Sequence, residues 1–306
     1  MAWKDGFKID YGYLVTGEVK TITENAAAVP GAITLATFDY DNRGNRTKLT
    51  RGNGTVTDYT PDAVSRLGTL AQMFPNAGAS TLTLGFGYNP AGQIAWNTRS
   101  NDLYSWTGHG SGTTGSTVNA LNQIATHGGV SFAHDAKGNL TSDGTRSYTY
   151  DAENRLKTAG TASLMYDPLG RLSWYTNAGG VLDYAGSRMV TELNDAANYA
   201  ILKRYVHGPG TDEPLVSYDG TGTANRRWLH ADERGSIIAQ SDASGAVTNT
   251  LRFDEYGIPA STNVGRFQYT GQMWLPTLGI YDYKARAYDP RLGRFLQPDP
   301  LGYGDG

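Results

Sequence analysis

The chain carries one short pattern twice in close succession, as YDAENRL at residues 150–156 and as YDPLGRL at residues 166–172. In both copies an aromatic residue and an aspartate precede two variable residues, an Asn or Gly, an Arg and a Leu. The aspartate carboxylate can accept a main-chain N–H group two residues further on, and Asn or Gly tolerates the left-handed backbone of a tight turn. Each copy therefore predicts a strand that ends at Tyr, a turn, and a return strand.

Related copies extend this pattern along the chain. A copy at residues 134–140 lies 16 residues before the one at 150–156, and about 16 residues accommodate two strands of ~5–6 residues plus their turns. An isolated hairpin is only marginally stable in water, so neighbouring hairpins should share a sheet. We predict an all-β fold of stacked antiparallel hairpins that form a curved or spiral sheet. A further full copy lies at residues 40–46. Weaker or shorter copies lie at residues 62–67, 88–94, 232–236 and 242–246.

The composition supports this fold class. Of the 306 residues, 39 are Gly and 20 are Tyr, which suits many turns and half-exposed strands. Residues 62–73 have weak helical spacing that Gly68 interrupts, so a short helix competes there with a copy of the repeat. The glycine-rich segment at residues 105–117 predicts a connection between hairpins, and residues 108–117 are the best candidate for a domain boundary.

Several classes of function find no support in the sequence. The net charge is −3 without a basic block, which does not favour nucleic-acid binding. Cysteine is absent, so disulfides and thiolate metal sites are excluded. The five histidines lack the spacing of a zinc site, and no apolar run approaches the ~18 residues of a membrane span. We therefore predict no metal, no cofactor, no signal peptide and no membrane span.

The C-terminal stretch at residues 281–299, YDYKARAYDPRLGRFLQPD, is dense in aromatic residues and arginines. It contains the Asp-Pro step at 289–290 and leads into a second one at 299–300. Asp-Pro commonly opens a turn. We expect this stretch to close the frame that the upstream hairpins build.

The repeats resemble the YD repeats of Rhs and teneurin-type proteins, which are named for the Tyr-Asp pair. The last third of the chain is similar to the Rhs repeat-associated core, and the whole resemblance covers roughly residues 35 to 306. Its most specific part is the terminal signature. The matching segments are RWLHADERGS at 227–236, FDEYG at 253–257, RFQYTGQ at 266–272, GIYDYKARAYDP at 279–290 and GRFLQPDP at 293–300.

The resemblance implies a fragment of a hollow shell. In such proteins YD hairpins wind into a spiral sheet that encloses a C-terminal toxin or other effector, and the core closes one end. We expect residues 1–225 to be the YD-repeat wall and residues 226–306 the core plug, in an open fragment with its C-terminal stretch on the concave face. The implied partners are the effector on the same polypeptide and a secretion apparatus. The implied location is secreted or delivered to the cell surface from a bacterium.

The resemblance also implies a site for self-cleavage. In several members of the family an aspartate-based site in the core cuts the chain downstream of the terminal Asp-Pro signature. Asp299 and Arg286 match the aspartate and the arginine of that signature. Some members carry Asp directly after the arginine, where this chain has Ala287, so Asp289 is the nearest substitute and Asp282 a more distant one.

Two alternatives stay open beside the autoprotease. In the first alternative, the arginines near these carboxylates form structural ion pairs, and the C-terminal stretch has a purely structural role. In the second, the many Trp and Tyr rings make the chain a carbohydrate- or cell-surface-binding repeat module. The primary prediction is a structural shell fragment that encapsulates and helps to deliver an effector, rather than an enzyme.

Overall fold

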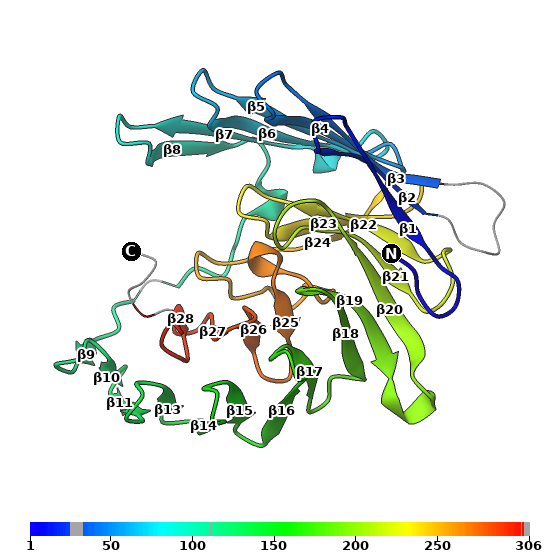
Figure 1. Ribbon diagram of the computed structural model, residues 1–306. Coiled ribbons are helices and arrows are strands. Elements are labelled where there is room, and N and C mark those ends of the chain that lie inside the picture. The colour runs from blue at the N-terminus through cyan, green and yellow to red at the C-terminus, as the bar shows by residue number, and fades with distance from the viewer. Residues whose placement is uncertain (25–32, 111, 301, 303–306) are drawn as a thin grey trace. The chain divides into compact units, whose positions relative to one another are not determined.

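The computed structural model describes residues 1–24, 33–110, 112–300 and 302 (Figure 1). Within these ranges the regular structure is β, apart from short 3₁₀ turns, so the predicted all-β class is confirmed. The 3₁₀ turns are η1 (Gly78–Ser80), η2 (Asp102–Tyr104), η3 (Asp195–Ala197) and η4 (Tyr269–Gly271). Two compact units make up the chain. Unit 1 holds residues 1–105, 202–252 and 261–264, and unit 2 holds residues 106–201, 253–260 and 265–306.

An eight-stranded antiparallel meander forms the first layer of unit 1, and each strand pairs with the next along the chain. The register shifts by one residue at the aromatic that ends a repeat, as between Asp39 and Tyr40. Such a bulge bends the strand and increases its local twist. The strands are β1 (Ile9–Tyr13), β2 (Val19–Glu24), β3 (Ile33–Tyr40), β4 (Arg46–Arg51), β5 (Val56–Pro61), β6 (Leu67–Met73), β7 (Leu82–Tyr88) and β8 (Ile94–Arg99).

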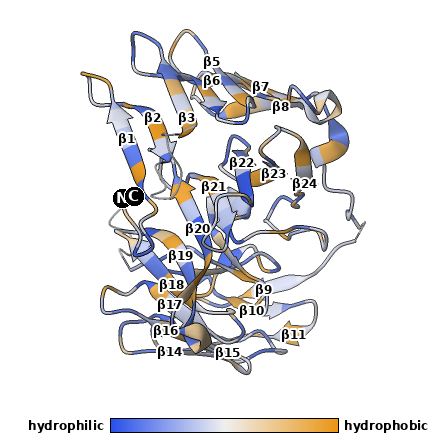
Figure 2. Cartoon of the chain, turned by 90° about the vertical axis from the view of Figure 1, so that its right-hand side faces the viewer, coloured by the Kyte–Doolittle hydropathy of each residue, from blue (hydrophilic) through white to orange (hydrophobic). Residues whose placement is uncertain are grey.

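A second antiparallel layer of unit 1 packs against this meander. Phe38, Val216 and Trp228 meet in one apolar cluster, and Phe74, Leu84 and Ile238 lie in a neighbouring cluster. Along β7 buried apolar residues alternate with less buried ones, as period-two patterning requires, and Figure 2 colours the strands by hydropathy. The second-layer strands are β20 (Ala200–His207), β21 (Pro214–Asp219), β22 (Arg226–Ala231), β23 (Ile237–Ser241) and β24 (Val247–Thr250).

Unit 2 begins with a row of short hairpins. Its strands are two to seven residues long, and consecutive strands pair in antiparallel fashion within each sheet. They are β9 (Ser116–Val118), β10 (Ile124–His127), β11 (Val130–Ser131), β12 (Ala133–His134), β13 (Leu140–Ser142), β14 (Tyr148–Tyr150), β15 (Leu156–Ala159), β16 (Ala162–Tyr166), β17 (Leu172–Tyr175), β18 (Val181–Ala185) and β19 (Arg188–Asn194).

The C-terminal segment of unit 2 forms its own four-stranded antiparallel sheet beside this row of hairpins. Main-chain contact between the two is direct, since the N–H of Leu140 donates to the carbonyl of Leu296 at 2.9 Å. Thr277 Oγ1 donates to the carbonyl of Thr176 at 3.2 Å. The strands are β25 (Met273–Leu275), β26 (Ile280–Asp282), β27 (Ala287–Asp289) and β28 (Arg294–Phe295).

The turn of each repeat has the geometry that its residues predict. In the copy at 166–172, Asp167 Oδ1 accepts the N–H groups of Leu169 and Arg171 at 2.9 and 3.0 Å. Its Oδ2 accepts Arg171 Nε at 2.6 Å, and Gly170 has a φ of 79°. The aspartate therefore binds both the turn and the residue that starts the return strand. The same pair of main-chain bonds forms at Asp41, Asp62, Asp135, Asp151, Asp232, Asp242 and Asp254.

The tyrosine of a repeat links it to the previous copy. Tyr166 Oη donates to the carbonyl of Leu156 at 2.9 Å, and the Arg155 guanidinium carbon lies 4.8 Å from the centroid of the Tyr166 ring. Tyr184 makes the same two contacts with Leu172 and Arg171. Burial raises the pKa of the Tyr166 hydroxyl. Each ring thus has a polar end that is held by the chain of the preceding hairpin.

The prediction of a short helix at residues 62–73 is wrong. Residues 67–73 form β6, which pairs with β5 on one side and β7 on the other. Asp62 binds the N–H groups of Val64 and Arg66, and Ser65 takes the left-handed conformation with a φ of 67°. The local turn and the two strand partners outweigh the weak helical spacing.

Candidate functional site

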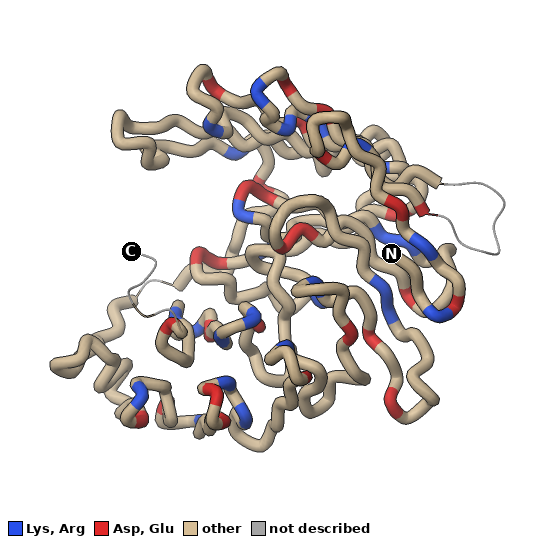
Figure 3. Tube along the Cα trace, in the orientation of Figure 1, with Lys and Arg blue, Asp and Glu red and all other residues tan. Residues whose placement is uncertain are grey.

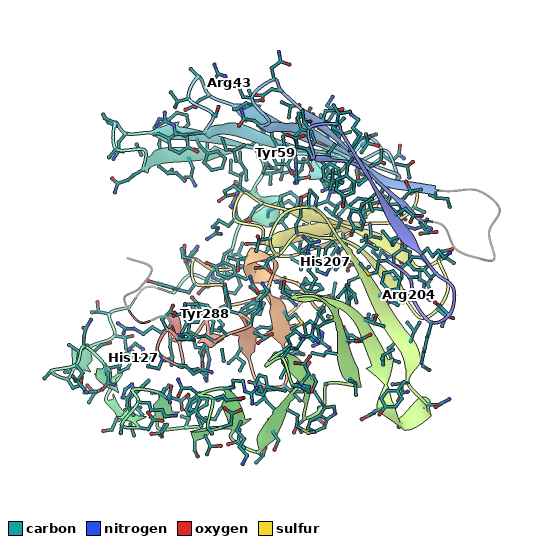
Figure 4. The ribbon with its side chains drawn as sticks, viewed as in Figure 1. Arg43, Tyr59, His127, Arg204, His207 and Tyr288 are labelled. Atoms are coloured by element: carbon teal, nitrogen blue, oxygen red, sulfur yellow. The ribbon has the colours of Figure 1, made fainter. Side chains whose placement is uncertain are left out.

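The terminal signature lies on the hairpin of β27 and β28, where Tyr288 pairs with Phe295 and Asp289 with Arg294. The turn between these strands contains Gly293, whose φ is 62°. Tyr288, labelled in Figure 4, donates its hydroxyl to the carbonyl of Tyr256 at 2.9 Å. The short strands and their aromatic residues thus hold the acidic residues of the signature in a defined place.

Arg286 and Asp299, the two residues that match the family signature, lie together. Arg286 Nη2 is 2.7 Å from Asp299 Oδ2, and each side chain is 25% exposed. The guanidinium carbon of Arg286 also lies 3.8 Å from the centroid of the Phe295 ring. Gln297 Oε1 accepts the N–H of Ala287 at 2.9 Å. These contacts fold the segment after β28 back onto the start of β27 and bring its aspartate to the arginine.

Asp289 is held by a different arginine. It is 0% exposed, and Arg291 binds it in bidentate fashion, with Nε 3.0 Å from Oδ1 and Nη2 2.5 Å from Oδ2. The N–H of Arg291 adds a third bond to Oδ1 at 3.0 Å. Charge-assisted, bidentate bonds of this kind are among the strongest in proteins. The structural ion pairs that the first alternative requires are therefore present at Arg291 as well as at Arg286.

A third carboxylate, Asp143, reaches Arg291 from the turn between β13 and β14. Its Oδ2 lies 3.2 Å from Arg291 Nη2 and accepts the Tyr148 hydroxyl at 2.8 Å. Its Oδ1 accepts the N–H groups of Thr145 and Arg146. Burial raises the pKa of Asp143, but these hydrogen bonds outweigh burial and hold that pKa at about 2. Asp143 is therefore an acceptor at neutral pH and does not supply a proton.

Asp143 is not among the site residues that the sequence predicts. The signal near it is an Asp-Gly step at 143–144, which indicates a turn and gives no partner. Asp143 and Arg291 are 148 positions apart, so their contact depends on how the C-terminal sheet packs on the hairpin row. The acid–Arg291–acid cluster of Asp143, Arg291 and Asp289 is named the terminal clamp below.

The geometry assigns two different arrangements to the signature. The terminal clamp ties β27 to an upstream hairpin through Arg291, whose side chain is 43% exposed and lies between two buried carboxylates. The partly exposed Arg286–Asp299 pair ties down the chain after β28. Aspartic-protease chemistry requires one carboxyl that keeps its proton beside one that is ionised. Within the terminal clamp both carboxylates accept bonds from Arg291, an arrangement that binds and positions rather than transfers protons.

A second buried ion pair supports the same attachment. Arg266, which precedes β25, binds Glu192 of β19 through Nε at 3.0 Å and Nη2 at 2.8 Å. The Arg266 side chain is 9% exposed and that of Glu192 is 7% exposed. Replacing either partner would leave an uncompensated buried charge, so each of these side chains requires the other when the segment is docked.

The other candidate features contribute little to a site. No group of three or more His, Asp or Glu side chains in the described ranges has the arrangement of a metal site. His134 lies in β12, as its place in the repeat predicts. Trp228 is buried, whereas Trp96 is 56% exposed, so these two rings do not form one platform. Among the described residues, no helix is long and apolar enough to cross a bilayer. Charges of both signs are spread over the chain (Figure 3).

Comparison with protein families gives one match that covers most of the chain. The family described as Teneurin YD-shell matches residues 98–305. Among curated proteins, the tRNA3(Ser)-specific nuclease WapA of Bacillus spizizenii is 29% identical over 322 residues, and the tRNA nuclease WapA of Bacillus subtilis is 30% identical over 322 residues. Each alignment covers 88% of this chain and 14% of the relative, so the chain spans only a small part of these proteins.

Solved structures share the fold at low sequence identity. The structure of the Photorhabdus luminescens Tc holotoxin pore matches with a TM-score of 0.60 at 17% sequence identity. The alignment covers 100% of this chain and 19% of the holotoxin chain. TcdB2-TccC3 without its hypervariable C-terminal region gives a TM-score of 0.57 at 16% identity and covers 99% of this chain and 20% of that chain. At these identities the similarity concerns the fold alone.

Proposed function

The chain belongs to the teneurin YD-shell family, and on that premise we propose that it is part of a shell wall that encloses an effector carried further along the same polypeptide. Residues 1–225 form the wall in this proposal, and residues 226–306 form the plug that closes it. The similarity to the WapA nucleases supports an effector that is toxic. Delivery out of the producing bacterium by a secretion apparatus is part of the same proposal.

The observation that carries the proposal is the terminal clamp. A wall that holds its cargo needs a closing segment that stays docked, and Arg291 binds Asp289, which is 0% exposed, and Asp143, which is 7% exposed. Removing the arginine leaves two buried carboxylates without their cation, which is strongly unfavourable. We therefore expect the closing segment to open when Arg291 is replaced, while the remainder of the wall stays folded.

Protease protection of the full-length protein tests the proposal. The native protein should shield its effector from added protease, and Arg291→Met should make the effector at least ten times more sensitive. Arg294→Met is the matched control, because Arg294 lies on the same hairpin and is exposed. Digestion of the effector at equal rates in the native protein and in Arg291→Met would refute the closure. Digestion as fast as that of the isolated effector would refute enclosure itself.

A second candidate function is self-cleavage downstream of the signature. The 2.7 Å contact between Arg286 and Asp299 favours it, since it joins two of the three residues assigned to that chemistry. Asp289, the third, is bound by Arg291, and Ala287 stands where some relatives have Asp. Intact-mass measurement of the full-length chain over time tests this function. Clipping that Asp299→Asn abolishes and Asp254→Asn leaves unchanged supports it, and a chain that stays whole rules it out.

Glycan binding is the remaining proposal for a partner. Exposed rings such as Trp96 and Tyr199 offer stacking surfaces for sugars. Calorimetric titration against a glycan panel that includes heparin decides it. Saturable binding that is lost on Trp96→Ala supports a binding module, whereas the absence of saturable binding supports a wall.

A further inference from the structure

Unit 1 contains a cavity of about 230 Å³ between its two layers of strands. Arg46, Arg51 and Tyr59 line it from the meander, and the loop after β20 and the end of β22 line it from the second layer. Its volume exceeds the ~150 Å³ of a cavity that accepts benzene. The space is therefore large enough for a small organic molecule.

Arg51 is the unusual residue of this cavity. It ends β4, is 3% exposed, and donates from Nη1 to Thr57 Oγ1 at 2.8 Å. Its Nε has no hydrogen-bond partner, and none of the ion pairs of the described residues includes Arg51. A buried cation that lacks a carboxylate is strongly unfavourable.

The hydrogen bond that Arg51 donates leads into a chain of neutral polar groups. Thr57 Oγ1 donates to Gln72 Oε1 at 2.7 Å, and Gln72 Nε2 donates to the carbonyl of Ala231 at 2.7 Å. Burial lowers the pKa of His230 well below its usual value, and the charge of Arg51 lowers it further. His230 is therefore neutral and neither adds a charge nor compensates one.

The other charged residues of the cavity have partners of their own. Arg46 is paired with Glu213, and both side chains are mostly buried. Asp232 and Glu233 line the cavity, and each has a carboxylate oxygen 3.7 Å from the guanidinium of Arg234, which lies outside the lining. Burial raises the pKa of Asp232 to about 6, and the charge of Glu233 adds to this effect. Burial also lowers the pKa of Arg51 to about 10, so its side chain is cationic at neutral pH.

We propose that Arg51 binds the carboxylate of a small singly charged ligand in this cavity. The planar guanidinium fork matches a carboxylate, and Nε is a donor that such a ligand would satisfy. The acidic residues that line the cavity, Asp212 and Glu213 with Asp232 and Glu233, repel a doubly charged anion more strongly than a singly charged one. The ligand of this proposal is therefore a monocarboxylate rather than a phosphate or sulfate.

Thermal unfolding in low-salt buffer, with sodium acetate and sodium chloride titrated separately, tests this site. Acetate should raise the unfolding midpoint of the native protein in a saturable manner. A rise of about 2–4 °C is expected once its concentration exceeds the dissociation constant about fivefold. Chloride at equal concentration should give a smaller and unsaturated change. Triglycine, compared with its C-terminal amide, distinguishes a polypeptide terminus from a free acid as the source of the carboxylate.

Variants at Arg51 separate this site from general salt effects. Arg51→Met should lose the acetate response and be at least as stable as the native protein without acetate, because it removes the unpaired buried charge. Arg51→Lys keeps the charge without the fork and should bind acetate at least tenfold more weakly. Arg43→Met, at an exposed turn residue labelled in Figure 4, should respond like the native protein. Equal responses to acetate and chloride in the native protein, or an undiminished acetate response in Arg51→Met or Arg51→Lys, would overturn the proposal.

Discussion

The buried ion pair between Glu24 and Arg226 in unit 1 allows a quantitative test of the packing between its two layers. The Glu24 side chain is 1% exposed and that of Arg226 is 10% exposed. Arg226 Nη2 lies 2.6 Å from Glu24 Oε1 and 2.8 Å from Oε2. Tyr218 donates its hydroxyl to Glu24 Oε2 at 2.6 Å. Glu24 therefore serves both a buried cation and a buried hydroxyl from the second layer.

Glu24→Gln removes the charge and keeps the shape. Removing one partner of a buried ion pair typically lowers the free energy of unfolding by about 3–5 kcal/mol. At about 2–4 °C of midpoint per kcal/mol, the unfolding midpoint should fall by roughly 6–20 °C. The surface pair of Lys203 and Asp219, whose side chains are 44% and 57% exposed, is the matched control. Asp219→Asn should change the free energy by at most about 1 kcal/mol.

The triple variant Glu24→Leu, Arg226→Met and Tyr218→Phe separates charge from packing. It replaces the whole cluster with apolar side chains of similar size, which is often neutral or stabilising. Urea unfolding followed by the fluorescence of Trp228, whose ring centroid lies 5.4 Å from the Arg226 guanidinium carbon, reports on this region. If Glu24→Gln stays within about 0.5 kcal/mol of the native protein, or if the triple variant is no more stable than Glu24→Gln, the argument from buried charge is refuted.

Three further predictions concern the repeats and the terminal clamp. Tyr166→Phe removes the hydrogen bond to the Leu156 carbonyl and should lower the free energy of unfolding by about 1–2 kcal/mol in urea titrations. An unchanged free energy would mean that this hydrogen bond does not stabilise the fold. Gly170→Ala forces a side chain into a φ of 79° and should cost about 1–2 kcal/mol by the same assay, whereas Gly115→Ala, with open space around it, should be nearly neutral. The lowered pKa of Asp143 means that its contribution to stability is complete above an unfolded pKa of about 3.9 and is lost as the pH falls toward about 2. Asp143→Asn should therefore flatten the acid limb of a stability–pH curve, and an unaltered limb would contradict the assignment.

The repeated turns could be predicted from the sequence because their contacts are local. Asp167 binds groups two and four positions along the chain, so the spacing of the residues specifies the turn. The left-handed position falls on Gly170 in one copy and on Asn154 in another, as the residue types predict. The strand that ends at each aromatic residue follows from the same spacing. The competing helix at residues 62–73 failed because helix spacing in a short segment is weaker than strand pairing on both sides.

The contact of Arg286 with Asp299 followed from the family signature, whereas the partner of Asp289 did not. Several arginines lie within a few positions of Asp289, and sequence spacing does not distinguish among them. The arginine that binds Asp289 is Arg291, which also binds Asp143 on a hairpin far upstream. The lack of a carboxylate partner for Arg51 could not be predicted from the sequence either, because its surroundings are built from β4, β5 and β6 together with the end of β22.

The sequence alone determined the hairpin, its turn and its left-handed residue, since these depend on hydrogen bonds that span at most five consecutive residues. It also identified the family, because the terminal signature is a string of adjacent residues. Tertiary structure decided the long-range pairs, such as Arg291 with Asp143 and Arg226 with Glu24, and which buried cation has no carboxylate. Those outcomes depend on which side chains packing brings within about 3 Å of one another after it removes water, and this is a property of segments that lie far apart in the chain.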